Sequence, residues 1–434
     1  MGLSRRRDGA PGGTRWIILA LLFGISSLAY FQRLNIQVAA DAMMPDLGLS
    51  LVQMGWIFAA FSWSYALFQF PGGLVGVRFG FRGPLLAIGL AWALLTLLTG
   101  ALPGTVLAST GAVVAGLWLV RFALGVAQAP VFPLQAGVIE AWFPVNGWAL
   151  PNALLTCGLG FGAAAATPVT AWVMETFGWR AAFTVLAPIG LPLLVVWWWL
   201  MRDDPARHPR LRPDELALIR AGRPSSVAAR THGSWKRVLR DRQVVLLTLS
   251  YFAGNYVYYV FFQWLYLYLV EERGFGRLQS GVLAALPWMT GSVAALVGGA
   301  VCDALCRRIG PRWGCRLPCL VALPAVGVLL LIGSRADSPI TAVTCLTLCF
   351  ALFQLTDPIY WAGATFVGGT ETAAATGVLN TGGNLPGILT GIAVPVLIAR
   401  FGWNAAFASG AIFALVAGLL WLAIDVERPL ATKA

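Results

Sequence analysis

Residues 16–40 read WIILALLFGISSLAYFQRLNIQVAA, and Arg33 is the only charged residue in this run. A helix of about 20 apolar residues crosses a bilayer, so the run is long enough to span one. At about 1.5 Å per residue, Arg33 lies about 25 Å from Trp16. An arginine at that depth costs a few kcal/mol unless it faces water or a partner. Two interpretations stay open: Arg33 snorkels to the far interface, or it faces a polar site.

The composition indicates a polytopic membrane protein. Of the 434 residues, 58% are hydrophobic and only 11% are charged, whereas a soluble domain has about 25% charged residues. The basic start, residues 1–14, resembles that of a signal peptide, but the apolar run after it is too long for one, so we expect a retained first span. The seven cysteines are odd in number and mostly lie in or beside apolar runs, which predicts no disulfide framework.

Twelve apolar runs are long enough to cross a membrane, which predicts an all-α membrane protein with two six-helix bundles. The expected spans are 16–40, 51–73, 84–104, 106–133, 150–173, 181–201, 243–270, 280–301, 316–334, 340–366, 373–399 and 404–424. The expected domains are an N-terminal bundle (1–201), a cytoplasmic linker (202–242) with a possible short helix at 214–221, and a C-terminal bundle (243–434). A regulatory domain in the linker is the alternative, but so short a polar stretch buries little core.

The basic residues predict the topology. With both termini in the cytoplasm, the inside segments hold 23 of the 30 Lys and Arg and the outside segments hold five. This asymmetry follows the positive-inside rule. It accounts for the net charge of +12 without a nucleic-acid partner.

The two halves of the chain resemble each other. FGWRAAF at 177–183 and FGWNAAF at 401–407 match at six of seven residues, with an offset of 224. Two further pairs keep nearly the same offset: Gly72-Gly73 with Gly298-Gly299, and Asn152 with Asn380. Three matches in order indicate an internal duplication, and equivalent spans start on the same side of the membrane, as in a parallel repeat.

Two loops resemble the cytoplasmic Gly-x-x-x-Asp-Arg gating loop of the major facilitator superfamily. They are residues 71–82, after the second span, and 299–312, after the eighth. Val77 stands where the family has an acidic residue, so we expect no such latch in the first loop. The gating-loop residues that match are Gly73, Arg78, Gly80, Asp303 and Arg307.

A finer resemblance covers nearly the whole chain. Residues 30–40, 53–73, 121–133, 142–144 and 380–384 are similar to the anion:cation symporter branch, which includes sugar-acid transporters, sialin and vesicular glutamate transporters. That resemblance implies that Arg33 and Arg121 face a central cavity and bind a substrate carboxylate. A guanidinium fork suits a carboxylate. An internal ion pair with a buried acid is the alternative for Arg121.

The departures from the family concern coupling. Gln32 and Gln128 stand where the family usually has Asp and Glu. Glutamine binds substrate by hydrogen bonds but does not titrate, so we do not expect proton symport by the family's route. Asp357 is the one carboxylate well inside a span and is our coupling candidate. The alternative is that Asp357 caps a helix break at Pro358; Na⁺ coupling and uncoupled transport also stay open.

Other polar and aromatic residues are candidates for the cavity, with a place in the interfacial aromatic belt as the alternative for the rings. The resemblance and the spacing favour Tyr65, Trp361, Asn380 and Asn384 as substrate-binding residues. Further candidates are Asn255, Tyr256, Tyr259, Gln263 and Trp264.

Cofactor and metal chemistry are not expected. Cys302-x3-Cys306 and Cys315-x3-Cys319 differ from the usual C-x2-C spacing, and helical packing explains them as well. No nucleotide-binding loop or catalytic triad spacing occurs in the sequence. We therefore expect no enzyme and no cofactor, with H⁺ and Na⁺ both open as the coupling ion.

The sequence favours a secondary active transporter that takes up a small organic anion, a sugar acid or another carboxylate, by alternating access. We expect a monomer in the bilayer of the inner membrane. Efflux of a hydrophobic or cationic compound is one alternative, although it would call for cavity acids rather than arginines. A non-transporting sensor that lost the family's coupling carboxylates is another.

Overall fold

The computed structural model describes residues 13–144, 147–220 and 235–428, and it confirms the all-α membrane fold. Among these residues, eleven helices are long and apolar enough to span a membrane. One of them, α12 (Arg277–Arg335), turns at Gly310, where φ is 83°. It therefore comprises two spans, and the twelve expected passes are present.

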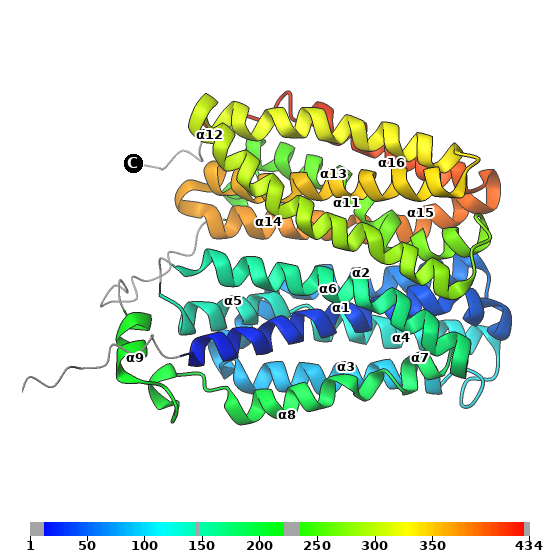
Figure 1. The fold of residues 1–434 in the computed structure, drawn as a ribbon, viewed down its shortest axis with the longest axis horizontal. Helices are drawn as coiled ribbons and strands as arrows, with labels where there is room; N and C mark the ends of the chain where they lie inside the picture. The colour runs from blue at the N-terminus through cyan, green and yellow to red at the C-terminus, as the bar shows by residue number, and fades with distance from the viewer. Residues whose placement is uncertain (1–12, 145–146, 221–234, 429–434) are drawn as a thin grey trace, which may run out of the picture.

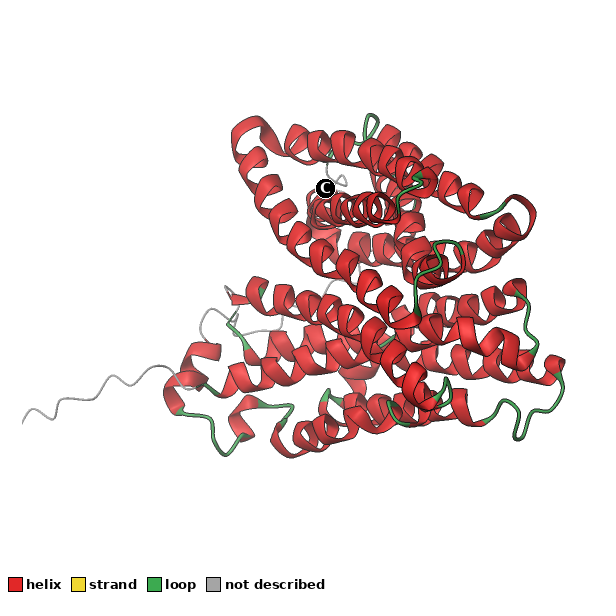
Figure 2. Ribbon diagram, turned by 45° about the vertical axis from the view of Figure 1, so that its right-hand side comes forward, coloured by secondary structure: helices red, strands yellow, loops and turns green. Residues whose placement is uncertain are grey.

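The helices form two groups that lie side by side in both views (Figures 1 and 2). The first group is α1 (Thr14–Leu47), α2 (Leu51–Phe79), α3 (Arg82–Ala101), α4 (Thr110–Gln128), α5 (Val131–Trp142), α6 (Ala149–Phe177), α7 (Ala181–Thr184), η2 (Ala187–Gly190) and α8 (Leu191–Leu200). The connecting segment has η3 (Pro205–Arg207), α9 (Pro213–Arg220) and α10 (Trp235–Val238). The second group is α11 (Arg242–Glu271), α12, α13 (Pro339–Gly368), η4 (Gly369–Glu371), α14 (Thr372–Asn384), α15 (Pro386–Phe401) and α16 (Trp403–Leu420).

Several helix ends differ from those expected. The first helix continues to Leu47 and ends at Gly48, whose φ of 63° is the left-handed conformation that glycine tolerates. The expected end of the fourth span at residue 133 is wrong, because α5 continues the path to Trp142. Pro133 lies in the first turn of α5, where a missing N–H costs no helical hydrogen bond.

The two ends of the bundle differ. We call the end that carries α9 the linker end, and the other end the opposite end. The first helix starts at the linker end, where the backbone N–H groups of Thr14 and Arg15 donate to the Glu215 carboxylate, at 3.4 and 3.0 Å. Glu215 thereby binds the free N–H groups of the first turn of α1.

A carboxylate holds the turn between α2 and α3 at the linker end. Asp203, which follows α8, accepts hydrogen bonds from the N–H groups of Phe81 (2.6 Å) and Arg82 (2.9 Å). Gly80 has a φ of 73°, and a Cβ there would lie 2.8 Å from the Asp203 carboxyl group. Val77 leaves this loop without its own acidic residue, and Asp203 supplies one from another helix end.

The second half repeats this arrangement. Glu427, which follows α16, accepts a hydrogen bond from the N–H of Arg312, at 3.2 Å, beside the turn at Gly310. Asp203 and Glu427 are 224 residues apart, which is the offset of the FGW repeat. We call the two arrangements the carboxylate latches.

Replacing Asp203 with alanine should lower thermal stability. The change leaves two N–H groups at the start of α3 without their acceptor, and losing such a cap costs about 1 kcal/mol. We expect the unfolding midpoint of the purified protein in detergent to fall by a few degrees. Asp337→Ala, which removes an exposed carboxylate at the opposite end, is the control. Equal midpoints for the two variants would contradict a structural role for the first latch.

Candidate functional site

Arg33 lies inside α1 and points toward the second half of the chain. Its side chain is 2% exposed, and its guanidinium donates a hydrogen bond to the Tyr259 hydroxyl, at 3.2 Å. The guanidinium carbon lies 4.4 Å from the ring centre of Phe61, 4.6 Å from that of Phe262 and 5.2 Å from that of Tyr65. The guanidinium therefore does not extend to the membrane surface; it lies in an aromatic cage that favours a cation.

Arg121 is the second buried cation of the site. It lies on α4, is 1% exposed and donates a hydrogen bond to the backbone carbonyl of Arg33, at 3.1 Å. Its guanidinium carbon is 5.6 Å from the ring centre of Phe61, so one ring contacts both arginines.

Neither arginine forms an ion pair within the described ranges of the chain, so the buried-acid alternative for Arg121 is not observed. The Nε atom of each is buried without a hydrogen-bond acceptor. Two neighbouring buried cations without a counter-charge are costly, and a bound anion would remove much of that cost. The pair is therefore a candidate anion site.

Close packing of α2 against α4 brings these groups together. A Cβ at Gly125 would lie 2.0 Å from the Ser64 hydroxyl and 2.5 Å from the Phe61 carbonyl oxygen. Gly125 is one helical turn beyond Arg121. The missing side chain therefore lets α4 approach α2 until Arg121 reaches Phe61.

A chain of hydrogen bonds runs from Arg33 into the second half. The Tyr259 hydroxyl, which accepts from Arg33, donates to the side-chain oxygen of Asn384, at 2.9 Å. The Asn384 amide donates in turn to the side chains of Asn380 (3.3 Å) and Gln69 (3.4 Å). The structure thus connects Asn380 and Asn384 with Arg33, and Gln69 of α2 returns the chain to the first half.

Phe61, Phe262 and Gln69 were not singled out by the sequence patterns, and Tyr259 was only one of several candidates. One signal was available: Arg33 and Tyr259 are 226 residues apart, which is the offset between the repeated glycine pairs. They therefore occupy equivalent positions in the two halves and meet where the halves face each other.

The two predicted glutamines do not face Arg33 in this conformation. Gln32 donates to the Ala187 carbonyl of η2, at 3.2 Å, and Gln128 donates to the Ala29 carbonyl of α1, also at 3.2 Å. Each amide thereby links two helices of the first half. Their contact with substrate stays a prediction.

Asp357 and Trp361 belong to a separate cluster in the second half. Asp357 accepts a hydrogen bond from the Tyr251 hydroxyl, at 2.8 Å, and the rings of Tyr251 and Trp361 are 6.4 Å apart. Helix α13 runs without interruption from Pro339 to Gly368, so Asp357 does not cap a helix break at Pro358. Its role in coupling stays a prediction.

The gating-loop residues lie at the linker end. Arg78, Asp303 and Arg307 are exposed, and Gly80 forms the turn that Asp203 holds. Gly73 lies within α2, and its surroundings are outside the described part of the chain.

The two halves pack tightly at the opposite end. A Cβ at Gly55 of α2 would lie 2.1 Å from the carbonyl oxygen of Gly391 in α15, and a Cβ at Gly281 of α12 would lie 2.8 Å from that of Thr167 in α6. The offsets within this set, 226 and 224, show that the repeat relates the two contacts. We call these four residues the seal.

Other contacts agree with closure at the opposite end. Asp41 of the first half and Arg277 of the second form an ion pair, at 2.8 Å. An enclosed space between the halves, beside Leu34 and Gln37, has a volume of about 10 Å³, which is about the room that one water needs. The site is therefore closed off from the opposite end.

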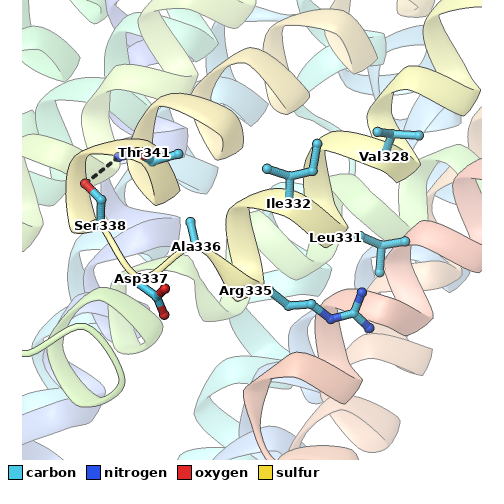
Figure 3. A pocket seen from close by; sticks show the side chains of 8 residues that line it. All are labelled: Val328, Leu331, Ile332, Arg335, Ala336, Asp337, Ser338 and Thr341. Carbon is cyan, nitrogen blue, oxygen red and sulfur yellow. Dashed lines mark hydrogen bonds between the residues drawn. The ribbon is translucent and has the colours of Figure 1, made fainter.

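A larger depression at the opposite end is a different feature (Figure 3). It has a volume of about 710 Å³ and lies where α12 ends and α13 begins. Its lining residues are Val328, Leu331, Ile332, Arg335, Ala336, Asp337, Ser338 and Thr341. None of the predicted site residues lines it.

Two helical halves with buried charge between them define a membrane transporter rather than an enzyme. The sequence profile of the Major Facilitator Superfamily matches residues 22–390. The chain belongs to this superfamily and is a multi-pass membrane transport protein, as the sequence predicted.

Several relatives are similar over most of their length. The probable galactarate/D-glucarate transporter GudP of Bacillus subtilis is 29% identical, over 90% of this chain and 87% of the relative. The probable sulfoacetate transporter SauU of Cupriavidus necator is 31% identical, over 90% and 88%. The solved structure of a bacterial homologue of the human lysosomal transporter Spinster, inward-facing and unoccupied, has a TM-score of 0.73 at 16% identity and covers 97% of this chain and 98% of its own, which shows the fold alone.

Replacing Tyr259 with phenylalanine should weaken substrate binding while the cage stays intact. The change removes the hydroxyl between Arg33 and Asn384, and a hydrogen bond to a charged group contributes about 1.5–3 kcal/mol. We expect the KM for uptake into proteoliposomes to rise about tenfold. Tyr256→Phe, on the same helix but bonded to Ser409 (3.0 Å), is the matched control. A KM that moves equally in both variants would count against Tyr259 as part of the site.

Proposed function

We propose that the protein transports a small organic anion across the cytoplasmic membrane, in the direction of uptake, and that Arg33 and Arg121 bind the anion. The observation that carries this proposal is the pair of buried guanidinium groups without an ion-pair partner in the described chain. The relatives support it, since their printed names refer to galactarate, D-glucarate and sulfoacetate. These compounds each carry two acidic groups, and two guanidinium groups match a dianion in charge.

The Arg33–Tyr259 contact suggests how binding is linked to alternating access. The positive-inside rule puts the linker end in the cytoplasm, so closure at the seal corresponds to a state that faces inward. Arg33 donates to Tyr259 of the other half in this state. An anion at Arg33 would compete with the Tyr259 hydroxyl as acceptor and so change the contact between the halves. A ligand shifts such an equilibrium only through contacts that differ between the two states.

Coupling is assigned to Asp357 rather than to the glutamines. Gln32 and Gln128 carry no titratable proton, whereas Asp357 lies inside the second half and is bonded to Tyr251. Coupling to Na⁺ and uncoupled transport remain the competing proposals.

Uptake of labelled D-glucarate, galactarate and sulfoacetate into proteoliposomes tests the proposal, with uncharged glucose as the control solute. We expect at least one anion to enter and glucose to be excluded. Imposing a pH gradient or a Na⁺ gradient then identifies the coupling ion. If a pH gradient drives accumulation, Asp357→Asn should abolish accumulation while counterflow continues. Absence of both binding and uptake of all three acids would overturn the proposed substrate class.

A further inference from the structure

Three cysteines meet at the linker end of α12. Cys302 and Cys306 lie before the turn at Gly310, and Cys315 lies after it. The Sγ atoms of Cys302 and Cys306 are 3.8 Å apart, those of Cys302 and Cys315 are 3.7 Å apart, and those of Cys306 and Cys315 are 3.9 Å apart. We call these three residues the thiol triad.

The turn is built so that the triad can form. Gly310 has a φ of 83°, which reverses the chain. A Cβ at Gly314 would lie 2.5 Å from the backbone nitrogen of Cys306 and 2.7 Å from its Sγ. A larger residue at position 314 would therefore separate the two arms and move Cys315 away from Cys306.

The sulfur separations match a metal–thiolate centre. With a Zn–S bond of about 2.3 Å, tetrahedral geometry puts neighbouring sulfur atoms about 3.8 Å apart. A trigonal arrangement with the same bond length puts them about 4.0 Å apart. The observed triangle, with sides of 3.7–3.9 Å, fits a single ion bound by all three sulfurs.

The surroundings suit a thiolate centre. Cys302 is 3% exposed and Cys315 is 0% exposed, whereas Cys306 is half-buried, which leaves a side open for an ion and a further ligand. Arg307, Arg308 and Arg312 follow in the same turn. Their positive charge offsets the negative charge of three thiolates, and cations beside a cysteine favour its thiolate form.

We propose that the thiol triad binds a thiophilic metal ion, either Zn²⁺ with an external fourth ligand or Cu⁺ in a trigonal site. Soft thiolate ligands select these ions. The C-x3-C spacing had suggested helical packing, but the ligands come from both arms of the turn and therefore need no C-x2-C motif. The ion would tie the inner ends of two spans together beside Glu427, which holds the same turn.

Metal content tests the proposal directly. We expect the full-length protein, purified with a non-thiol reductant and without chelator, to contain about one Zn or Cu per chain by elemental mass spectrometry. Cys302→Ser, Cys306→Ser and Cys315→Ser should each lose most of that metal. Cys319→Ser, which removes another buried thiol of the same helix that lies outside the triad, should keep it and is the matched control.

A second measurement does not depend on the variants. Adding Co²⁺ to metal-stripped wild-type protein should produce a sulfur-to-cobalt charge-transfer band that saturates near one equivalent and that Zn²⁺ or Cu⁺ removes. Elemental analysis for both metals distinguishes the two ions. A folded, monodisperse wild-type protein that contains no Zn or Cu and shows no cobalt band would overturn the proposal, and the triad would then be packing of reduced thiols only.

Discussion

Replacing Arg33 with glutamine should reduce the specific uptake of organic anions at least about 30-fold. The change removes a buried charge that we assign to the substrate, and truncating one partner of a buried charged pair costs about 2–5 kcal/mol. Each 1.4 kcal/mol is a factor of ten in affinity. Arg121→Gln should show a loss of the same size, because that guanidinium also lies buried without an ion pair in the described chain. Initial uptake rates in proteoliposomes over a range of substrate concentrations measure the effect.

Two comparisons keep this test specific. Arg33→Lys keeps the charge but loses the planar fork, so we expect partial activity from it. Arg335→Gln removes an exposed arginine of the depression in Figure 3 and should transport normally. If Arg33→Gln and Arg121→Gln both transport at wild-type rates, the anion site is not where we place it.

Gly55→Ala should stop turnover by preventing closure at the seal. The new Cβ would lie 2.1 Å from the Gly391 carbonyl oxygen and 2.6 Å from the Pro395 ring. Backbone does not move aside as a flexible side chain does, and overpacking costs about 1–3 kcal/mol or more. The closed state would lose that much relative to the open state, so its population should fall about tenfold or more.

Accessibility distinguishes this effect from misfolding. In the Gly55→Ala protein, a cysteine introduced at Gln37, beneath the seal, should react faster with an impermeant thiol reagent added from the opposite end. Gly111→Ala, where a Cβ would meet nothing within 4 Å, should leave both uptake and labelling unchanged. Normal uptake by Gly55→Ala would show that the close approach of α2 and α15 is not required for transport.

Hydrophobicity and charge were sufficient to predict the fold. Apolar runs gave the twelve passes because a membrane span requires length and composition above all. The helix ends were less predictable, and α5 shows why. Prolines at 130 and 133 suggested a stop, yet proline in the first turn of a helix breaks no hydrogen bond.

The candidate site was predicted only in part. Arg33 and Arg121 were found because a charge inside an apolar run is conspicuous. Their partners were not, since Phe61 and Phe262 are ordinary residues in a membrane span and acquire a role only through packing. Gln128 shares a helix face with Arg121, but a shared face does not fix a shared neighbour, and its amide binds the Ala29 carbonyl of α1 instead.

The carboxylate latches have a consequence for how the molecule moves. Each latch ties the end of the last helix of a half to the start of its third, through Asp203 in one half and Glu427 in the other. A half that is fastened to itself in this way resists internal deformation and moves as a rigid body. The free energy of switching then resides in the surface between the halves, where single glycines set how close the helices come. An ancestral half, before duplication, would already have carried its own fastening and needed only a second copy to rock against.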